Sequence, residues 1–155
     1  RRRSMIDFLG DLCACVKRID AGVKTTVVLL PQDLYLVDEL ATLPQIDTIG
    51  SHLFWNLLNE DVTMVGKHGS SLVEVTRKYN KRSQLWLQNF NLDESSEEQL
   101  ALAFTELLSA EPDELGCYYY WRNNADPDRV WEITRGLLRR IPRRQLHWQA
   151  TLMNQ

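Results

Sequence analysis

Few of the residues that mark disulfide-bonded or metal-bound proteins are present in this sequence. Its 155 residues include three cysteines and three histidines. Cys13 and Cys15 lie two apart on an expected helix and point in different directions, and an odd count without regular spacing gives no disulfide framework. His52, His68 and His147 lack the spacing of metal ligands. We therefore expect reduced thiols that are mostly buried, no metal and no cofactor.

Motifs that point to familiar reactions or destinations are also missing. The sequence has no CxxC, HExxH, GxGxxG or GxxxxGK pattern. No apolar run is long enough to cross a membrane, and neither a signal peptide nor an Asn-x-Ser/Thr acceptor is visible. The formal net charge of -3 gives no overall attraction for nucleic acid. From these absences we expect no membrane or nucleic-acid partner and a cytoplasmic location.

Helical and strand patterns alternate along the chain. Apolar residues at helical spacing predict helices over residues 4–19, 33–44, 66–82, 93–110 and 126–141. Runs rich in β-branched and aromatic residues predict strands over residues 24–31, 46–55, 84–92 and 115–121. This order predicts one parallel sheet covered by helices. We expect one α/β domain over 1–142 and a C-terminal tail over 143–155.

Local signals predict where three of these helices begin. Asp33 is an expected N-cap of the second helix. Ser95 and Glu98 have the spacing of a capping box at the start of the fourth. Asp126 is expected to cap the last helix, with the following proline at its first position, and Asn123 and Asn124 fit a turn before it.

Two architectures fit this order of elements. One is an open, doubly wound sheet of the flavodoxin kind, which would serve as a binding or regulatory module. The other is four consecutive units of a (β/α)₈ barrel, or half a barrel, preceded by one helix. In the third strand, Leu85 and Leu87 would face the helices. Trp86 and Gln88 would then face the other way, and a barrel interior accepts them better than a second helix-covered face does.

The start of the sequence suggests a piece of a longer protein. The first helix begins almost at Arg1, with little chain before it. A half barrel would need its missing N-terminal half or would associate with itself. A third hypothesis is a structural role in which exposed strand edges pair with another chain.

The second half of the chain resembles part of a known fold family. A Trp-x-Gln-x-Phe strand, an acidic capped helix and the stretch CYYYW together resemble strands seven and eight of (β/α)₈-barrel, glycoside-hydrolase-like proteins. The stretch IDTIGSHLFW is similar to a sixth strand of such barrels. The resemblance is carried mainly by residues 84–132. It implies the C-terminal half of a carbohydrate-active barrel, with a carbohydrate as the expected substrate.

The resemblance also implies where chemistry should lie. Glycoside hydrolases use a pair of carboxylates, and one member of the pair would lie in the absent half, so we expect no catalysis by this chain alone. Any parent enzyme would be a glycoside-hydrolase-like hydrolase. Weaker candidates for a catalytic role are His52 and Asp33.

The carboxyl ends of the strands are the expected place for a sugar. Aromatic rings suit the apolar faces of sugars, whereas amides and an arginine suit their hydroxyl groups. The candidate substrate-binding residues at these positions are Trp55, Gln88, Asn91, Trp121 and Arg122.

Overall fold

A computed structural model describes residues 2–118 and 123–141 of the chain. Its helices are α1 (Arg2–Ile19), the 3-10 helix η1 (Pro31–Leu36), α2 (Val37–Ala41), α3 (Met64–Lys78), α4 (Glu94–Ser109) and α5 (Pro127–Leu138). Its strands are β1 (Thr26–Leu29), β2 (Thr48–Leu53), β3 (Arg82–Gln88) and β4 (Glu114–Tyr118). The predicted alternation of strands and helices is confirmed. The expected tail over 143–155 lies outside the described residues.

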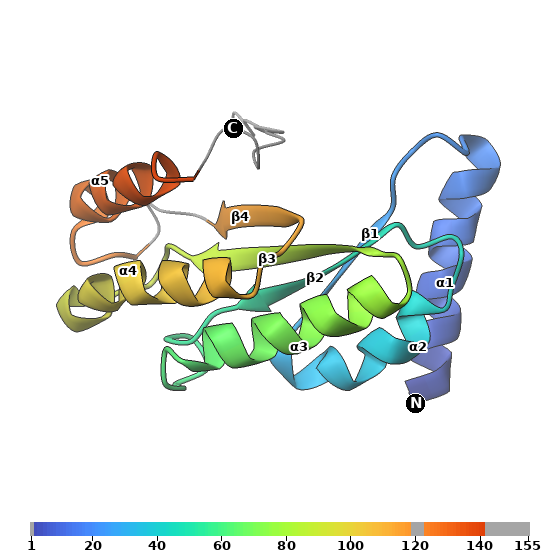
Figure 1. Ribbon diagram of the computed structural model, residues 1–155, viewed down its shortest axis with the longest axis horizontal. Coiled ribbons are helices and arrows are strands. Elements are labelled where there is room, and N and C mark those ends of the chain that lie inside the picture. Colours follow the sequence, from blue (N-terminus) through green and yellow to red (C-terminus); the bar gives the residue numbers. More distant parts are fainter. Residues whose placement is uncertain (1, 119–122, 142–155) are drawn as a thin grey trace.

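The four strands form one parallel sheet in the order β1-β2-β3-β4 (Figure 1). Each strand therefore pairs with its neighbours in sequence, so that Leu53 lies opposite Leu87 and Leu87 opposite Cys117. Right-handed crossovers between successive neighbours place all the connecting helices on one face. A doubly wound sheet needs a reversal of strand order to cover both faces. This sheet has no reversal, so the flavodoxin-like alternative does not fit, whereas half a (β/α)₈ barrel does.

The core lies between the helix-covered face of the sheet and helices α3 and α4. Leu53, Leu85 and Leu87 point to this face and are 0% exposed. Burial of such side chains is the main source of stability for a fold of this kind. Gly69 brings α3 close to the sheet, because a Cβ atom there would lie 3.0 Å from Leu85 Cδ1.

The other face of the sheet, here called the open face, carries an aromatic cluster. His52, Trp86 and Gly116 lie side by side in register across β2, β3 and β4. A Cβ atom on Gly116 would lie 2.4 Å from Trp86 Cε3, so the indole ring occupies the space of a missing side chain. The members of the cluster, with ring centroids 4.8 to 6.5 Å apart, are His52, Phe54, Trp86, Phe90 and Tyr118.

The predicted helix over residues 33–44 differs from the observed structure. The chain first forms the 3-10 helix η1 and then the short helix α2. Pro31 starts η1 because its fixed φ suits a first helical position. Leu30 therefore occupies the N-cap position without a side-chain cap, and the prediction that Asp33 is the N-cap is wrong.

The other two predicted helix starts have different outcomes. The N-cap of α4 is Asp93, whose carboxylate accepts a hydrogen bond from Ser96 N at 2.8 Å. The prediction that Ser95 is the N-cap in a capping box is therefore wrong, because the helix is capped two residues earlier. Asp126 caps α5 as predicted, accepting from Arg129 N at 3.0 Å.

Helix α1 stands across the end of the sheet at which the strands begin (Figure 1). Its buried residues are Ile6, Gly10 and Cys13. Much of its apolar stripe is exposed: Phe8 is 62% and Leu12 53% exposed. Among the described residues, every helix is too short or too polar to serve as a membrane span.

Candidate functional site

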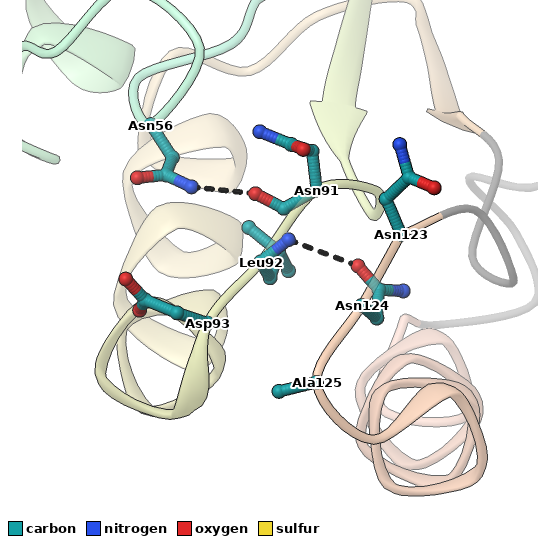
Figure 2. Close-up of a pocket in the computed structure, with 7 residues that line it drawn as sticks. All are labelled: Asn56, Asn91, Leu92, Asp93, Asn123, Asn124 and Ala125. Atoms are coloured by element: carbon teal, nitrogen blue, oxygen red, sulfur yellow. Dashed lines mark hydrogen bonds between the residues drawn. The ribbon is translucent and has the colours of Figure 1, made fainter.

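A hollow opens at the edge of the sheet where the strands end. It has a volume of about 600 Å³ and is open to solvent (Figure 2). Ligands of parallel α/β folds usually bind at this edge, because the loops after the strands converge there. The residues that line the hollow are Asn56, Asn91, Leu92, Asp93, Asn123, Asn124 and Ala125.

Asparagine side chains tie the loops of the hollow together. Asn56 Nδ2 donates to Asn91 O at 2.7 Å, which joins the loop after β2 to the loop after β3. Leu92 N donates to Asn124 Oδ1 at 3.1 Å, and Asn124 Nδ2 donates to Asn89 O at 2.8 Å. The three loops are therefore held at fixed separations by side-chain amides.

Asn91 and Asn123 differ from these tying residues. Both have left-handed backbones, with φ of 55° and 52°, a conformation that asparagine tolerates better than most residues. Both side chains are exposed, and within the described part of the chain neither amide makes a hydrogen bond. Figure 2 shows the two amides projecting away from the bonded loop segments. They are the groups of the hollow that are most available to a ligand.

Gln88 is buried and holds the loop after β2 in place. Its side chain is on the open-face side of β3 but is 0% exposed. Gln88 Oε1 accepts from Asn56 N at 3.1 Å and from Leu57 N at 3.3 Å, and Gln88 Nε2 donates to Phe90 O at 2.9 Å. All of its amide atoms are thus occupied by main-chain partners. Gln88 therefore positions the loop after β2 that lines the hollow, and its own side chain is not accessible to a substrate.

Trp55 lies in the core. It is 1% exposed, and Trp55 Nε1 donates to Gln99 Oε1 of α4 at 3.1 Å. The structure therefore does not bring Trp55 to the hollow. Aromatic surface near the strand ends comes from Phe90 and Tyr118, whose ring centroids lie 5.6 Å apart. The other aromatic candidate, Trp121, and the candidate Arg122 lie outside the described residues.

His52 and Asp33, the two candidates for a catalytic role, are not among the residues that line the hollow. His52 stacks on Phe54 within the aromatic cluster, at 4.8 Å between centroids, and burial lowers the pKa of its imidazole. It is therefore neutral at neutral pH. Asp33 lies in the first turn of η1.

The carboxylates near the strand ends are used to hold loops and helices. Hydrogen bonds from the Ser96 amide and the Ser95 hydroxyl lower the pKa of Asp93. Those from Thr63 lower the pKa of Asp61 in the loop after β2. The buried Glu97 accepts from Asp126 N at 2.8 Å. In the part of the chain that is described, no cluster of three or more His, Cys, Asp or Glu residues could hold a metal.

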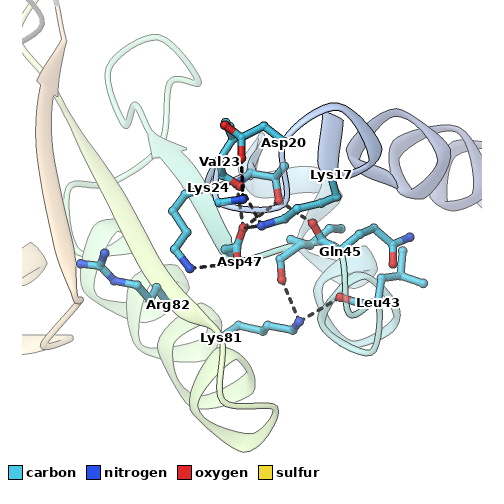
Figure 3. A network of polar contacts seen from close by, with 12 residues as sticks. Lys17, Asp20, Val23, Lys24, Leu43, Gln45, Asp47, Lys81 and Arg82 are labelled. Atoms are coloured by element: carbon cyan, nitrogen blue, oxygen red, sulfur yellow. Dashed lines mark hydrogen bonds and ion pairs between the residues drawn. The ribbon is translucent and has the colours of Figure 1, made fainter. Parts of the chain in front are cut away.

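At the opposite edge of the sheet, Asp47 joins α1 to β2 (Figure 3). Its carboxylate accepts from Lys17 Nζ at 2.6 Å and from Thr25 N at 2.8 Å. Lys81 Nζ lies in the same region and donates to Leu43 O at 2.9 Å and to the carbonyl of Ile46 at 2.7 Å. These contacts satisfy charges and main-chain carbonyls, so this edge is organised for stability.

No protein-family model matches the sequence, and a search of curated proteins gives no match. Among solved structures, the chain is similar to the endo-beta-1,4-mannanase from Thermotoga petrophila, with a TM-score of 0.52 and 10% sequence identity. The similarity covers 88% of this chain and 40% of the mannanase chain. At 10% sequence identity, this similarity shows that the two proteins share a fold and nothing more specific. Because the mannanase is a TIM-barrel glycoside hydrolase, the likeness supports the half-barrel architecture.

Proposed function

We propose that the chain is the half-barrel part of a carbohydrate-active, glycoside-hydrolase-like protein, and that the hollow at the strand ends binds a sugar chain. The observation that carries the proposal is the pair of exposed amides on Asn91 and Asn123, held by tied loops at the carboxyl edge of a parallel sheet. An amide offers both a donor and an acceptor, which suits the hydroxyl groups of a sugar.

No ring lines the hollow as described, but Phe90 of the aromatic cluster directly precedes the lining residue Asn91, and this neighbour supports a carbohydrate as the ligand. Phe90 and Tyr118 provide ring faces at the ends of β3 and β4, and Tyr118 is 38% exposed. Sugar rings combine apolar C–H faces with polar edges, so a site with rings beside amides can recognise both. The fold likeness to a mannanase makes a β-1,4-linked mannan chain the first ligand to examine.

The proposed role of this chain alone is binding without hydrolysis. Glycosidic bond cleavage needs two carboxyl groups, one of them protonated at the start of the reaction. Asp61 and Asp93 both have a lowered pKa and are bound to loop hydroxyls and amides. Such carboxylates are ionised at neutral pH and are poor proton donors. The catalytic pair would require residues from the rest of a complete barrel.

The proposal can be tested by titrating the 155-residue chain with mannohexaose in a calorimeter. Glycine replaces asparagine well at positive φ, so N91G and N123G remove an amide while keeping the backbone conformation. Each variant should weaken binding by a factor of about three to ten, the range expected for the loss of one hydrogen bond.

Asn80 provides a matched control. It has φ of 55°, is exposed, and lies between α3 and β3 at the other edge of the sheet. N80G should bind mannohexaose as well as the unaltered chain does. The proposal is wrong if no mannohexaose, cellohexaose or xylohexaose binds, or if N80G weakens binding as much as N91G.

A further inference from the structure

The sheet ends in two edges to which no strand is paired among the described residues. In the order β1-β2-β3-β4, strands β1 and β4 each pair on one side. Edge strands of soluble proteins usually carry a charge, a proline or a bulge that discourages further pairing. Strand β1 has the sequence TVVL and pairs with β2 in unbroken register. It is therefore suited to accept another strand.

The open face is packed like part of the interior of a barrel. Large and small residues alternate across it, since the indole of Trp86 lies against Gly116. The ring centroids of His52 and Tyr118 lie 6.0 Å apart on the same face. At its margins, Val28 is 37% and Tyr118 38% exposed. Further strands closing over the face would bury this apolar surface.

Four side chains of the open face, Arg82, Gln84, Trp86 and Glu114, bond to one another, and the face carries no net charge. Arg82 Nη1 and Glu114 Oε1 lie 3.0 Å apart, and these are the charged residues of the four strands as described. Gln84 Nε2 donates to Glu114 Oε2 at 2.7 Å, and Trp86 Nε1 donates to Gln84 Oε1 at 2.9 Å. A second copy of this face would meet no electrostatic repulsion.

We propose that two copies of the chain close into one eight-stranded barrel, in which β4 of each copy pairs with β1 of the other. A two-fold axis along the strand direction keeps all eight strands parallel and closes both edges at once. Eight parallel strands are the number that forms a filled (β/α) barrel. Helix α5, which follows β4, would cover the new junction as α3 covers the junction of β2 and β3.

Sedimentation analysis of the 155-residue chain tests this directly. The expected species has twice the monomer mass of 18.1 kDa. V28K places a charge on the open-face side of the edge strand β1. Because Val28 is partly exposed in the single chain, a lysine there should not disturb the folded monomer, but it would be buried in the barrel. This variant should sediment as a monomer with an unchanged far-UV spectrum. Leu102 on α4 is 46% exposed, and L102K should remain a dimer.

Two results would overturn the inference. A monomer at every concentration tested would mean that another segment or another protein covers the open face. If F8K is a monomer while V28K remains a dimer, the two copies associate through the exposed apolar stripe of α1 and not through the open face. Neither result depends on sugar binding, so this test and the mannohexaose titration can fail independently.

Discussion

At the scale of single residues, Asp47 shows how one side chain organises an edge of the sheet. Burial alone would raise the pKa of its carboxyl, but hydrogen bonds from Lys17 and Thr25 outweigh burial and hold this pKa well below its ordinary value. The side chain is 20% exposed, so solvent screens these contacts only in part. The ionised form is thus favoured by folding.

D47N should lower the free energy of unfolding at pH 7 by about 2 kcal/mol, the size expected for charge-assisted hydrogen bonds. Since the folded pKa of Asp47 is depressed, its stabilisation is present above the unfolded pKa, near 4, and is lost as the pH falls toward the folded pKa. The difference between D47N and the unaltered chain should therefore shrink between pH 5 and pH 2. Urea unfolding over this range measures it.

Asp38 is the control for this prediction. It also pairs with a lysine, Lys78, but on the exposed surface, where an ion pair contributes little. D38N should leave urea unfolding at pH 7 nearly unchanged. Equal losses in D38N and D47N would contradict the stabilising role assigned to the partly buried contacts of Asp47.

At the scale of elements, helix α5 fixes the far wall of the hollow. Asp126 caps it, and the Asp126 amide donates to the buried carboxylate of Glu97 on α4. Ala125 N donates to Leu92 O at 2.8 Å in the adjoining turn. The start of α5 therefore positions the loop that carries Asn123.

D126A should lower the free energy of unfolding by about 1 kcal/mol, the usual cost of removing an N-cap side chain. The matched control is D128A, which removes a carboxylate from the first turn of α5 without removing the cap. Urea unfolding should separate the two variants, and amide NMR shifts in D126A should be confined to the start of α5 and its contacts. Equal destabilisation by D128A would contradict a capping role.

Local patterns in the sequence predicted element type better than the contacts of individual side chains. Alternation of period two placed Leu85 and Leu87 on the helix-covered face and Gln88 on the other, as the structure confirms. It could not show that the amide of Gln88 is taken by Asn56 N, because that partner lies 32 residues away in sequence. The strand predicted over 46–55 includes Trp55, whereas β2 ends at Leu53; the hydrogen bond that holds Trp55 in the core is made to Gln99, 44 residues away in sequence.

The stripe on α1 shows a second limit of the same kind. Periodicity identifies which face of a helix is apolar, but not what covers that face. On α1, Phe8 and Leu12 of the apolar face are mostly exposed, whereas Cys13 is buried.

At the scale of the whole molecule, stability should vary across the sheet. Strands β2 and β3 are paired on both sides, whereas β1 and β4 are edges. In the monomeric form of the chain, amides of β2 and β3 should show the slowest hydrogen exchange, and amides of β1 and β4 should exchange faster. Exchange measured by NMR or mass spectrometry would contradict this if all four strands were equally protected.

The strand order has a consequence for synthesis of the chain. Each strand pairs with the strand made just before it, so no strand of this sheet must wait for a segment far downstream. Folding can therefore follow translation from the amino-terminal units onward, adding one strand and one helix at a time as they leave the ribosome.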